Sequence, residues 1–236
     1  GWAHGLLGDV GSVAHGRAVV YGFTISNCAA EAGAEGGGVR LSQGLVSNCR
    51  LLANRAARGG GAAVGAGGIL RNCLVSGNAA ADSGGGVLFD GGGRLENGTL
   101  VSNSAASSGG GLFVAAGTTG TCVNTIVYHN AAESAGSNWA VSAGQRLLFS
   151  NGCMAPAAGA GLEAADTIDA DPQFLDLPAG GGRLSGSSPC LNAGVNQGWM
   201  QDAQDLDGRP RKDRLTGRVD IGAYEHLAGG SVWSLR

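Results

Sequence analysis

Aspartates gather in the last third of the chain, where their oxygens could bind a cation. Calcium takes about six to eight oxygen ligands, and aspartate-rich turns supply them. Asp202, Asp205 and Asp207 form the densest group and include a partial DxDG pattern that is shorter than an EF-hand loop. These three residues are one candidate calcium site. The alternative is that the aspartates cap turns and pair with the arginines that follow them in the sequence.

The middle of the chain carries arginines instead, and we hypothesise that they form a weak contact surface for an anionic glycan. The alternative is a solvated face of scattered charges. A glycoside hydrolase needs two carboxylates at a defined separation, and a lyase needs a base beside a cation. The middle of the chain shows no acidic cluster of that kind. The five arginines are Arg50, Arg55, Arg58, Arg71 and Arg94.

The six cysteines divide by position. Cys49 and Cys73 occupy equivalent places in neighbouring repeats, so they are either a disulfide or two buried thiols. Cys153 and Cys190 lie in an irregular part of the chain, where loop cysteines are best explained as a staple formed in an oxidising compartment. There is no CxxC and no paired histidine, which argues against a zinc site.

The elements that position these residues come from a repeat. Four times, a triple glycine is followed by two asparagines six residues apart. The first asparagines are separated by 24, 25 and 27 residues (72 − 48, 97 − 72, 124 − 97). A fixed period in this range indicates a repeat architecture. The asparagine pairs are Asn48 with Asn54, Asn72 with Asn78, Asn97 with Asn103, and Asn124 with Asn130.

Short apolar runs with alternating positions stand between the glycines and asparagines, and none is long enough for a helix. Three short strands per unit predict an all-β fold, a right-handed parallel β-helix with turns of about 24–27 residues. Stacked turns lie roughly 4.8 Å apart. Glycine and asparagine tolerate the positive φ of tight corners, and stacked asparagine amides can bond from turn to turn.

We predict one domain over residues 1–236: irregular first turns in 1–35, regular turns in 36–152 and an irregular C-terminal cap region in 153–236. The net charge of −3 without a basic patch argues against nucleic acid, and no apolar run approaches a membrane span. The N-terminus carries no charged signal-peptide region, so we expect a mature or truncated chain. Strands are predicted at residues 17–27, 146–149, 169–175 with 182–184, and 219–224.

The C-terminal segments DADPQFLD, SPCLNAG, DLDGRPR and VDIGAYE follow the glycine-rich turns. Together they resemble bacterial parallel β-helix surface proteins of the choice-of-anchor Q domain group, which are similar to polymorphic outer-membrane protein repeats. The resemblance implies a secreted or cell-surface location and pairing of Cys153 with Cys190. It implies no activity, and a fold does not decide function.

The sequence therefore predicts a non-catalytic extracellular β-helix with a structural, adhesion or glycan-contact role, without a required cofactor. Its partners would be a glycan or further copies stacked end to end, since an open first turn would invite pairing. The alternative is a polysaccharide lyase or glycoside hydrolase, or the accessory domain of one. Trp139 and Trp199 could stack on sugar or plug an end of the solenoid.

Overall fold

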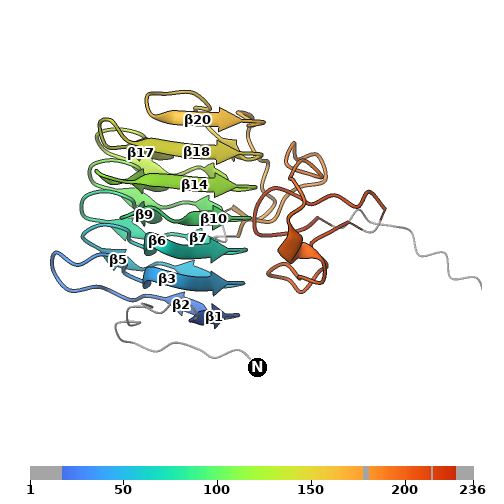
Figure 1. Ribbon diagram of the computed structural model, residues 1–236, viewed down its shortest axis with the longest axis horizontal. Coiled ribbons are helices and arrows are strands. Elements are labelled where there is room, and N and C mark those ends of the chain that lie inside the picture. The colour runs from blue at the N-terminus through green and yellow to red at the C-terminus, as the bar shows by residue number, and fades with distance from the viewer. Residues whose placement is uncertain (1–17, 178–180, 214, 227–236) are drawn as a thin grey trace, which may run out of the picture.

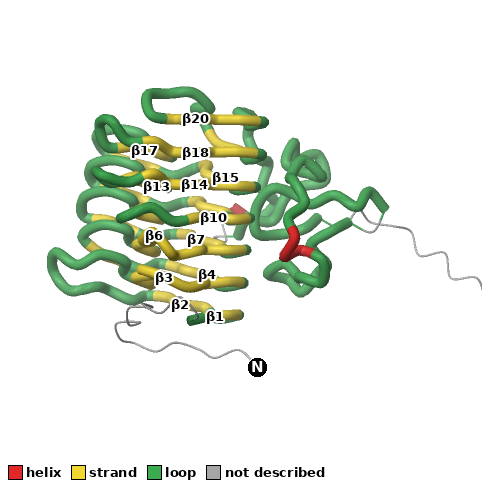
Figure 2. Tube along the Cα trace, in the orientation of Figure 1, coloured by secondary structure: helices red, strands yellow, loops and turns green. Residues whose placement is uncertain are grey.

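The computed structural model describes residues 18–177, 181–213 and 215–226. They form stacked turns of parallel strands, which confirms the predicted all-β parallel β-helix (Figures 1 and 2). Of the irregular first turns predicted for 1–35, residues 1–17 lie outside the described part. No helix among the described residues is long and apolar enough to cross a membrane.

Each full turn contributes to three parallel sheets. The first contains β1 (Val19–Tyr21), β3 (Val39–Ser47), β6 (Ala62–Arg71), β9 (Val87–Phe89), β10 (Arg94–Glu96), β13 (Leu112–Val114), β14 (Thr119–Val123), β17 (Trp139–Val141), β18 (Arg146–Ser150) and β20 (Leu162–Ala165). The second contains β2 (Thr24–Ser26), β4 (Arg50–Leu52), β7 (Leu74–Ser76), β11 (Thr99–Val101), β15 (Ile126–Tyr128) and β19 (Cys153–Met154). The third contains β5 (Arg55–Ala56), β8 (Ala79–Ala80), β12 (Ser104–Ala105) and β16 (Ala131–Ala132).

The interior is filled by the residues that the repeat places in register. Val46, Leu70, Leu95 and Cys122 pair in sequence along the first sheet and are fully or almost fully buried. Because equivalent residues stack directly, each turn buries its apolar face only against its neighbours. The triple glycines permit this close stacking. A Cβ on Gly60, for example, would collide with backbone carbonyl oxygens of the same and the next turn.

The second asparagine of each unit forms a continuous internal ladder. The Asn54 amide donates to Oδ1 of Asn78 (3.0 Å), and Asn78 donates to Oδ1 of Asn103 (2.9 Å). Each Oδ1 also accepts the backbone N–H of the preceding asparagine in the ladder, as Asn130 does from Asn103 (3.0 Å). The predicted amide stacking is confirmed for these four buried residues, whose side chains satisfy one another's hydrogen-bonding groups.

The first asparagine of each unit turns the corner between the first and second sheets. Asn48, Asn72, Asn97 and Asn124 have φ values of 49° to 52°, in the left-handed region. In this row the described side-chain contacts include only one stacked pair, in which Asn124 donates to Oδ1 of Asn97 (3.2 Å). Prediction treated the two rows alike, but the first row faces outward and is free to bind another part of the chain.

That part is the C-terminal segment, defined as residues 169–177, 181–213 and 215–226. Asn48 and Asn72 both donate to the Gln204 carbonyl, at 2.9 and 2.8 Å. Asn124 exchanges two hydrogen bonds of 2.8 Å with the backbone of Val195. The segment therefore lies along the side of the stacked turns (Figure 1). The predicted boundary between regular turns and cap at 152/153 is wrong, because β19 and β20 still extend the second and first sheets. The irregular part that follows covers a flank of the solenoid, where it satisfies the outward asparagine amides.

Apolar contacts fasten the same interface. Leu74 and Val101 of the second sheet pack with Leu206, Ala223 and Tyr224. A second group joins the solenoid to the segment further along the axis, formed by Ile126, Cys153, Leu184, Cys190 and Ile221.

Several strand predictions can be compared directly. Strands β1, β2 and β18 confirm the predictions at residues 17–27 and 146–149. The pair predicted at 169–175 and 182–184 is reduced to one antiparallel bridge, Phe174 with Leu184. The strand predicted at 219–224 is wrong: Val219 makes a single bridge to Gly194. Its apolar residues alternate because they pack on the solenoid surface. Trp139 plugs the end of the first sheet, where its Nε1 donates to the Pro156 carbonyl (2.9 Å).

Candidate functional site

The five predicted glycan-contact arginines do not form one surface. Arg50 donates to the Leu206 carbonyl (2.9 Å) beneath the C-terminal segment. Arg55 lies exposed on the third sheet, and Arg58 forms an ion pair with Glu35. Only Arg71 and Arg94 share a site. Periodicity could place these residues on turns but could not show which of the three sheets each one would face.

Arg71 and Arg94 meet at a buried carboxylate. Arg71 Nε lies 2.8 Å from Glu96 Oε2, and Arg94 Nη2 lies 3.0 Å from Glu96 Oε1. The three residues belong to the outer face of β6 and β10, where Arg71 is in register with Glu96. Glu96 thereby neutralises one of the two guanidinium charges.

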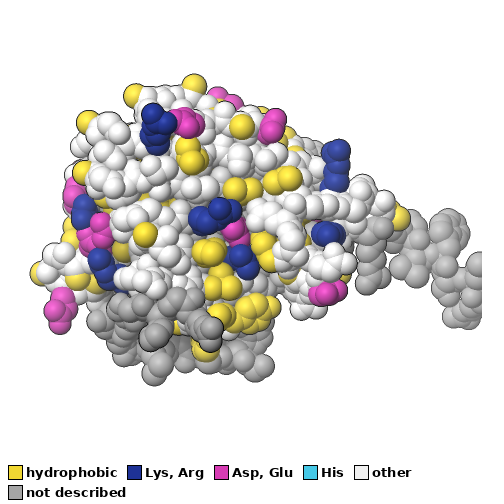
Figure 3. Space-filling model, viewed as in Figure 1, with side chains coloured by type: hydrophobic (Ala, Val, Ile, Leu, Met, Phe, Trp, Pro, Cys, Tyr) yellow, Lys and Arg dark blue, Asp and Glu magenta, His cyan; other side chains and the backbone are white. Residues whose placement is uncertain are grey.

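Arg71 also forms the floor of a groove at the junction between the solenoid and the C-terminal segment. The groove has a volume of about 280 Å³. Its floor is a column of the first sheet in which Tyr21 pairs with Ser47 and Ser47 pairs with Arg71. Tyr21 is 58% exposed. Figure 3 shows side chains of both charges and hydrophobic side chains gathered where the strands meet the C-terminal loops.

The wall of this junction groove comes from the C-terminal segment. Trp199, Asp202 and Gln204 line it. The Arg71 guanidinium lies 4.7 Å from the Trp199 ring centroid, a cation–π contact. Trp199 sits in the 3-10 helix η2 (Gly198–Met200), which Met200 anchors by being almost fully buried. Trp199 Nε1 donates to Gln197 Oε1 (2.8 Å), which fixes the indole in the wall.

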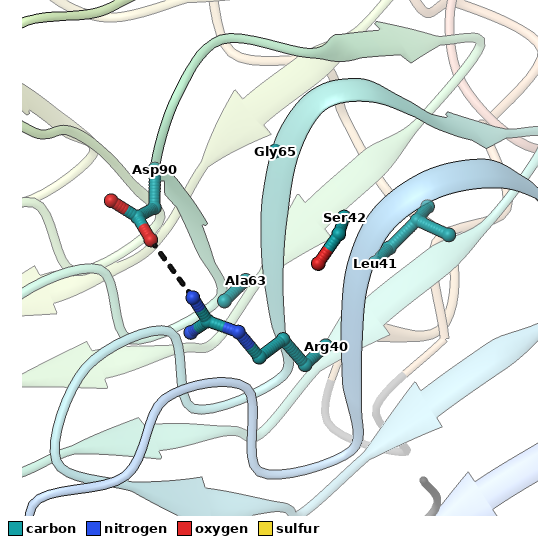
Figure 4. Close-up of a pocket in the computed structure, with 6 residues that line it drawn as sticks. All are labelled: Arg40, Leu41, Ser42, Ala63, Gly65 and Asp90. Atoms are coloured by element: carbon teal, nitrogen blue, oxygen red, sulfur yellow. Dashed lines mark hydrogen bonds and ion pairs between the residues drawn. The ribbon is translucent and has the colours of Figure 1, made fainter. Parts of the chain in front are cut away.

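A second ionic site joins several turns near the triple-glycine edge of the first sheet. Arg40 forms ion pairs with Glu35 and with Asp90, the latter at 3.1 Å (Figure 4). Hydrogen bonds from Arg40 and Arg58 hold the pKa of Glu35 below its ordinary value despite the opposing effect of burial. The adjoining cavity is only about 20 Å³. The sequence did not point to Glu35, because its partner Arg58 belongs to the neighbouring turn and approaches it only when the turns stack.

The candidate calcium site does not form. Asp205 Oδ1 accepts the backbone N–H groups of Asp207 and Arg209, each at 2.8 Å. Asp207 is held by Arg183 through two bonds of 2.7 Å, and this lowers the pKa of Asp207. Asp202 points instead into the junction groove. The described residues contain no group of three or more His, Cys, Asp or Glu side chains arranged to hold a metal.

The predicted cysteine partners are neighbours, but the structure holds them as thiols. The hydrogen bond between the Cys153 and Cys190 thiols is the main cause of the raised pKa of Cys153, and burial is the second cause. Cys49 and Cys73 also share a hydrogen bond, which lowers the pKa of Cys49, while burial raises that of Cys73. The stacked thiols at Cys49 and Cys73 match one of the two alternatives, and the predicted Cys153–Cys190 disulfide is not formed in this structure.

Comparison of the chain with protein-family models, with curated proteins and with solved structures finds no match in any of the three. The resemblance to the choice-of-anchor Q group therefore stays a hypothesis. The candidate site is defined by its own geometry: an indole, a phenol, a guanidinium and a carboxylate around one groove.

Proposed function

We propose that the protein is a non-catalytic extracellular or cell-surface β-solenoid that binds a saccharide in the junction groove. The observation that carries the proposal is the meeting of Tyr21 and Trp199 with Arg71 and Asp202 around one groove. Aromatic rings offer apolar faces to the C–H faces of a sugar, and a few polar groups fix its orientation.

The charges favour a neutral saccharide over an anionic one. Arg71 and Asp202 both line the groove, and Glu96 forms an ion pair with Arg71. A guanidinium donates to sugar hydroxyls and a carboxylate accepts from them, so the pair suits a hydroxyl-rich ligand. A ligand carboxylate would meet Asp202, and like charges disfavour binding. The anionic glycan expected from the arginines alone is therefore replaced by a neutral one.

The described carboxyl groups with a raised pKa, Asp220 and Glu225, do not line the groove, which favours a binding role. A general acid needs a raised pKa at a position that substrate can reach. The pKa of Glu35 is lowered. Glu225 has a pKa raised to about 9 because it is buried, but it is 3% exposed and lies outside the groove. These features favour a surface that holds a glycan without cleaving it.

A glycan array carrying neutral and uronate-containing oligosaccharides, followed by calorimetric titration of the ligands found, tests this function. We expect neutral oligosaccharides to bind, and Trp199→Ala to weaken binding by about tenfold or more as stacking is lost. Arg55→Ala, on the distant third sheet, is the matched control and should leave affinity unchanged. Absence of glycan binding, or equal binding by Trp199→Ala, would refute the groove as a saccharide site.

End-to-end assembly is a second candidate function, supported by the sheet order. The first sheet ends at β17 and β20, and the residues of β20 are half-buried to exposed. Edge strands offer unpaired backbone groups to another chain. Small-angle scattering over a concentration series should show rods that lengthen if copies stack. A particle of one chain whose length does not change with concentration would overturn end-to-end assembly.

The proposed extracellular location rests on the resemblance and on the adjacency of Cys153 and Cys190. An oxidising compartment would join these two thiols and tie the C-terminal segment to β19. Peptide mapping of the protein secreted by its source cells, without reductant, should find this pair linked. Recovery of both residues as thiols would argue for a reducing compartment.

A further inference from the structure

The C-terminal segment is docked through a buried charged cluster that neither the groove nor the repeat explains. The Arg211 cluster consists of Asp205, Arg211, Asp220 and Glu225, each 3% exposed or less. Arg211 Nη2 lies 2.9 Å from Glu225 Oε1, and Arg211 Nη1 donates to Asn72 Oδ1 (3.2 Å). The guanidinium thus connects the segment to an outward asparagine of the solenoid.

The cluster holds more acids than bases. One guanidinium faces three carboxyl groups, so full ionisation would leave two uncompensated negative charges out of water. Isolated buried charges are costly, and buried groups shift toward their neutral forms instead. Arg211 Nε has no hydrogen-bond partner among the described residues. One guanidinium donor is thus left unsatisfied. The cluster is short of positive charge, and a proton on one carboxyl group would reduce that excess of negative charge.

The remaining contacts point to Glu225 as the site of that proton. Asp205 accepts three backbone N–H groups through its two oxygens, so its carboxylate is fully engaged as an acceptor. Asp220 accepts backbone N–H groups from Asn192 and His226, each at 2.7 Å. Glu225 accepts one N–H, that of Asp220, shared between its two oxygens at 3.1 and 3.2 Å, apart from the contact with Arg211.

We propose that the Arg211 cluster is a pH-sensitive switch that docks the C-terminal segment on the solenoid and so controls whether the junction groove has a wall. Arg211 and Asp220 face the Glu225 carboxyl group. Asp205 accepts the backbone N–H of Glu225, and Arg209 donates to the Glu225 carbonyl oxygen (2.8 Å). From the solenoid, Asn72 and Asn97 face the cluster and carry no charge. As regulation of the same groove, the inference rests on the proposed function for its biological meaning.

The direction of the switch follows from proton linkage. Burial raises the pKa of Glu225 to about 9, and burial also raises that of Asp220. Groups with raised folded-state pKa values bind more protons when docked, so docking is strongest at low pH. It weakens as pH rises from the ordinary carboxyl value near 4.5 to about 9. One proton gives at most about a tenfold rise in the undocking constant per pH unit.

Fluorine NMR of the whole chain labelled with 5-fluorotryptophan tests the switch without a ligand. The Trp199 signal, assigned with Trp199→Phe, should change between about pH 6 and pH 9.5 by no more than tenfold per unit in population ratio. The Trp139 signal, at the end of the solenoid, is the internal control and should stay constant. Glu225→Gln keeps the neutral shape without titrating, so its Trp199 signal should stay in the docked position.

A wild-type Trp199 signal that is constant over this range overturns the switch, even if Glu225→Gln fails to fold. An unchanged transition in a folded Glu225→Gln variant overturns Glu225 as its proton site. The proposed function is judged separately by glycan titration at about pH 6, where the segment is docked. Glycan binding together with a constant Trp199 signal would support the saccharide site and overturn the switch. A pH-dependent Trp199 signal without any glycan ligand would support the switch and overturn the saccharide site.

Discussion

The interior of the solenoid and the docked C-terminal segment bury their polar groups in opposite ways. The solenoid buries neutral amides, each of which repeats the bonds of the one before, as Asn78 and Asn103 do. The segment buries charges that occur once, around Arg211. A neutral ladder is insensitive to pH and tolerates extension by further turns. A cluster of charges specifies one docked position and makes that position dependent on protons.

The largest effect is expected from removing the central positive charge of the Arg211 cluster. Arg211→Met leaves three buried carboxyl groups without a cation, and breaking a buried ion pair costs about 3–5 kcal/mol. We expect the segment to undock while the solenoid stays folded, since each turn contacts only its neighbours. Hydrogen exchange should show lost protection at residues 219–224 and retained protection at residues 99–105.

Lys212→Met is the matched control, because it removes a cation at the next position in the sequence. The Lys212 Nζ makes only an exposed contact with Gln201 (3.4 Å). It should leave both regions protected. Loss of protection throughout the chain in Arg211→Met would contradict the separation of the two regions. It would show that the segment is required for the turns themselves to stay stacked.

A cut in the neutral ladder should cost less but affect the whole solenoid. Asn103→Ala leaves the buried N–H of Asn78 without its acceptor at 3.0 Å. An unsatisfied buried group costs about 1–3 kcal/mol, and the lost amide also served Asn130 and the Val75 carbonyl. We expect the free energy of unfolding in urea to fall by about 2–3 kcal/mol.

Asn48→Ala provides the comparison from the outward row. Asn48 is half-buried and donates to the Gln204 carbonyl (2.9 Å), which water can also reach. Its removal should cost about 0.5–1.5 kcal/mol, the net value of one hydrogen bond. Equal effects of the two variants would mean that the internal ladder contributes no more than an ordinary surface contact.

The same contrast explains which features were predictable. The strands and the asparagine ladder recur four times, so spacing alone revealed them and placed Val46, Leu70 and Leu95 in one column. The docked segment occurs once and has no period. Asp205 and Asp220 were visible as acidic residues, but their burial depends on packing against Asn72 and Asn97. The calcium hypothesis included Asp205 but not Asp220, and neither it nor the alternative of turn-capping aspartates predicted that the two carboxyl groups are buried in docking.

The junction groove was beyond prediction for a related reason. Trp199 was recognised as a residue that could stack on sugar, and Arg71 as one that could contact a glycan. Their meeting at 4.7 Å requires the chain to return after more than a hundred residues to its own early turns. Local patterns carry no information on that return.

The smallest expected effect comes from a charge pair of the solenoid itself. Arg146 and Glu163 lie 2.7 Å apart across β18 and β20, but their side chains are 66% and 52% exposed. An exposed pair contributes about 0.2–1 kcal/mol. Arg146→Ala should therefore lower the free energy of unfolding by at most about 1 kcal/mol, and by less in high salt. Urea titrations at low and high ionic strength measure both quantities. A loss comparable to that of Arg211→Met would show that charge itself, and not its burial, distinguishes the segment from the solenoid. A negligible loss would show that an exposed pair contributes little to the solenoid compared with its buried ladder and apolar interior.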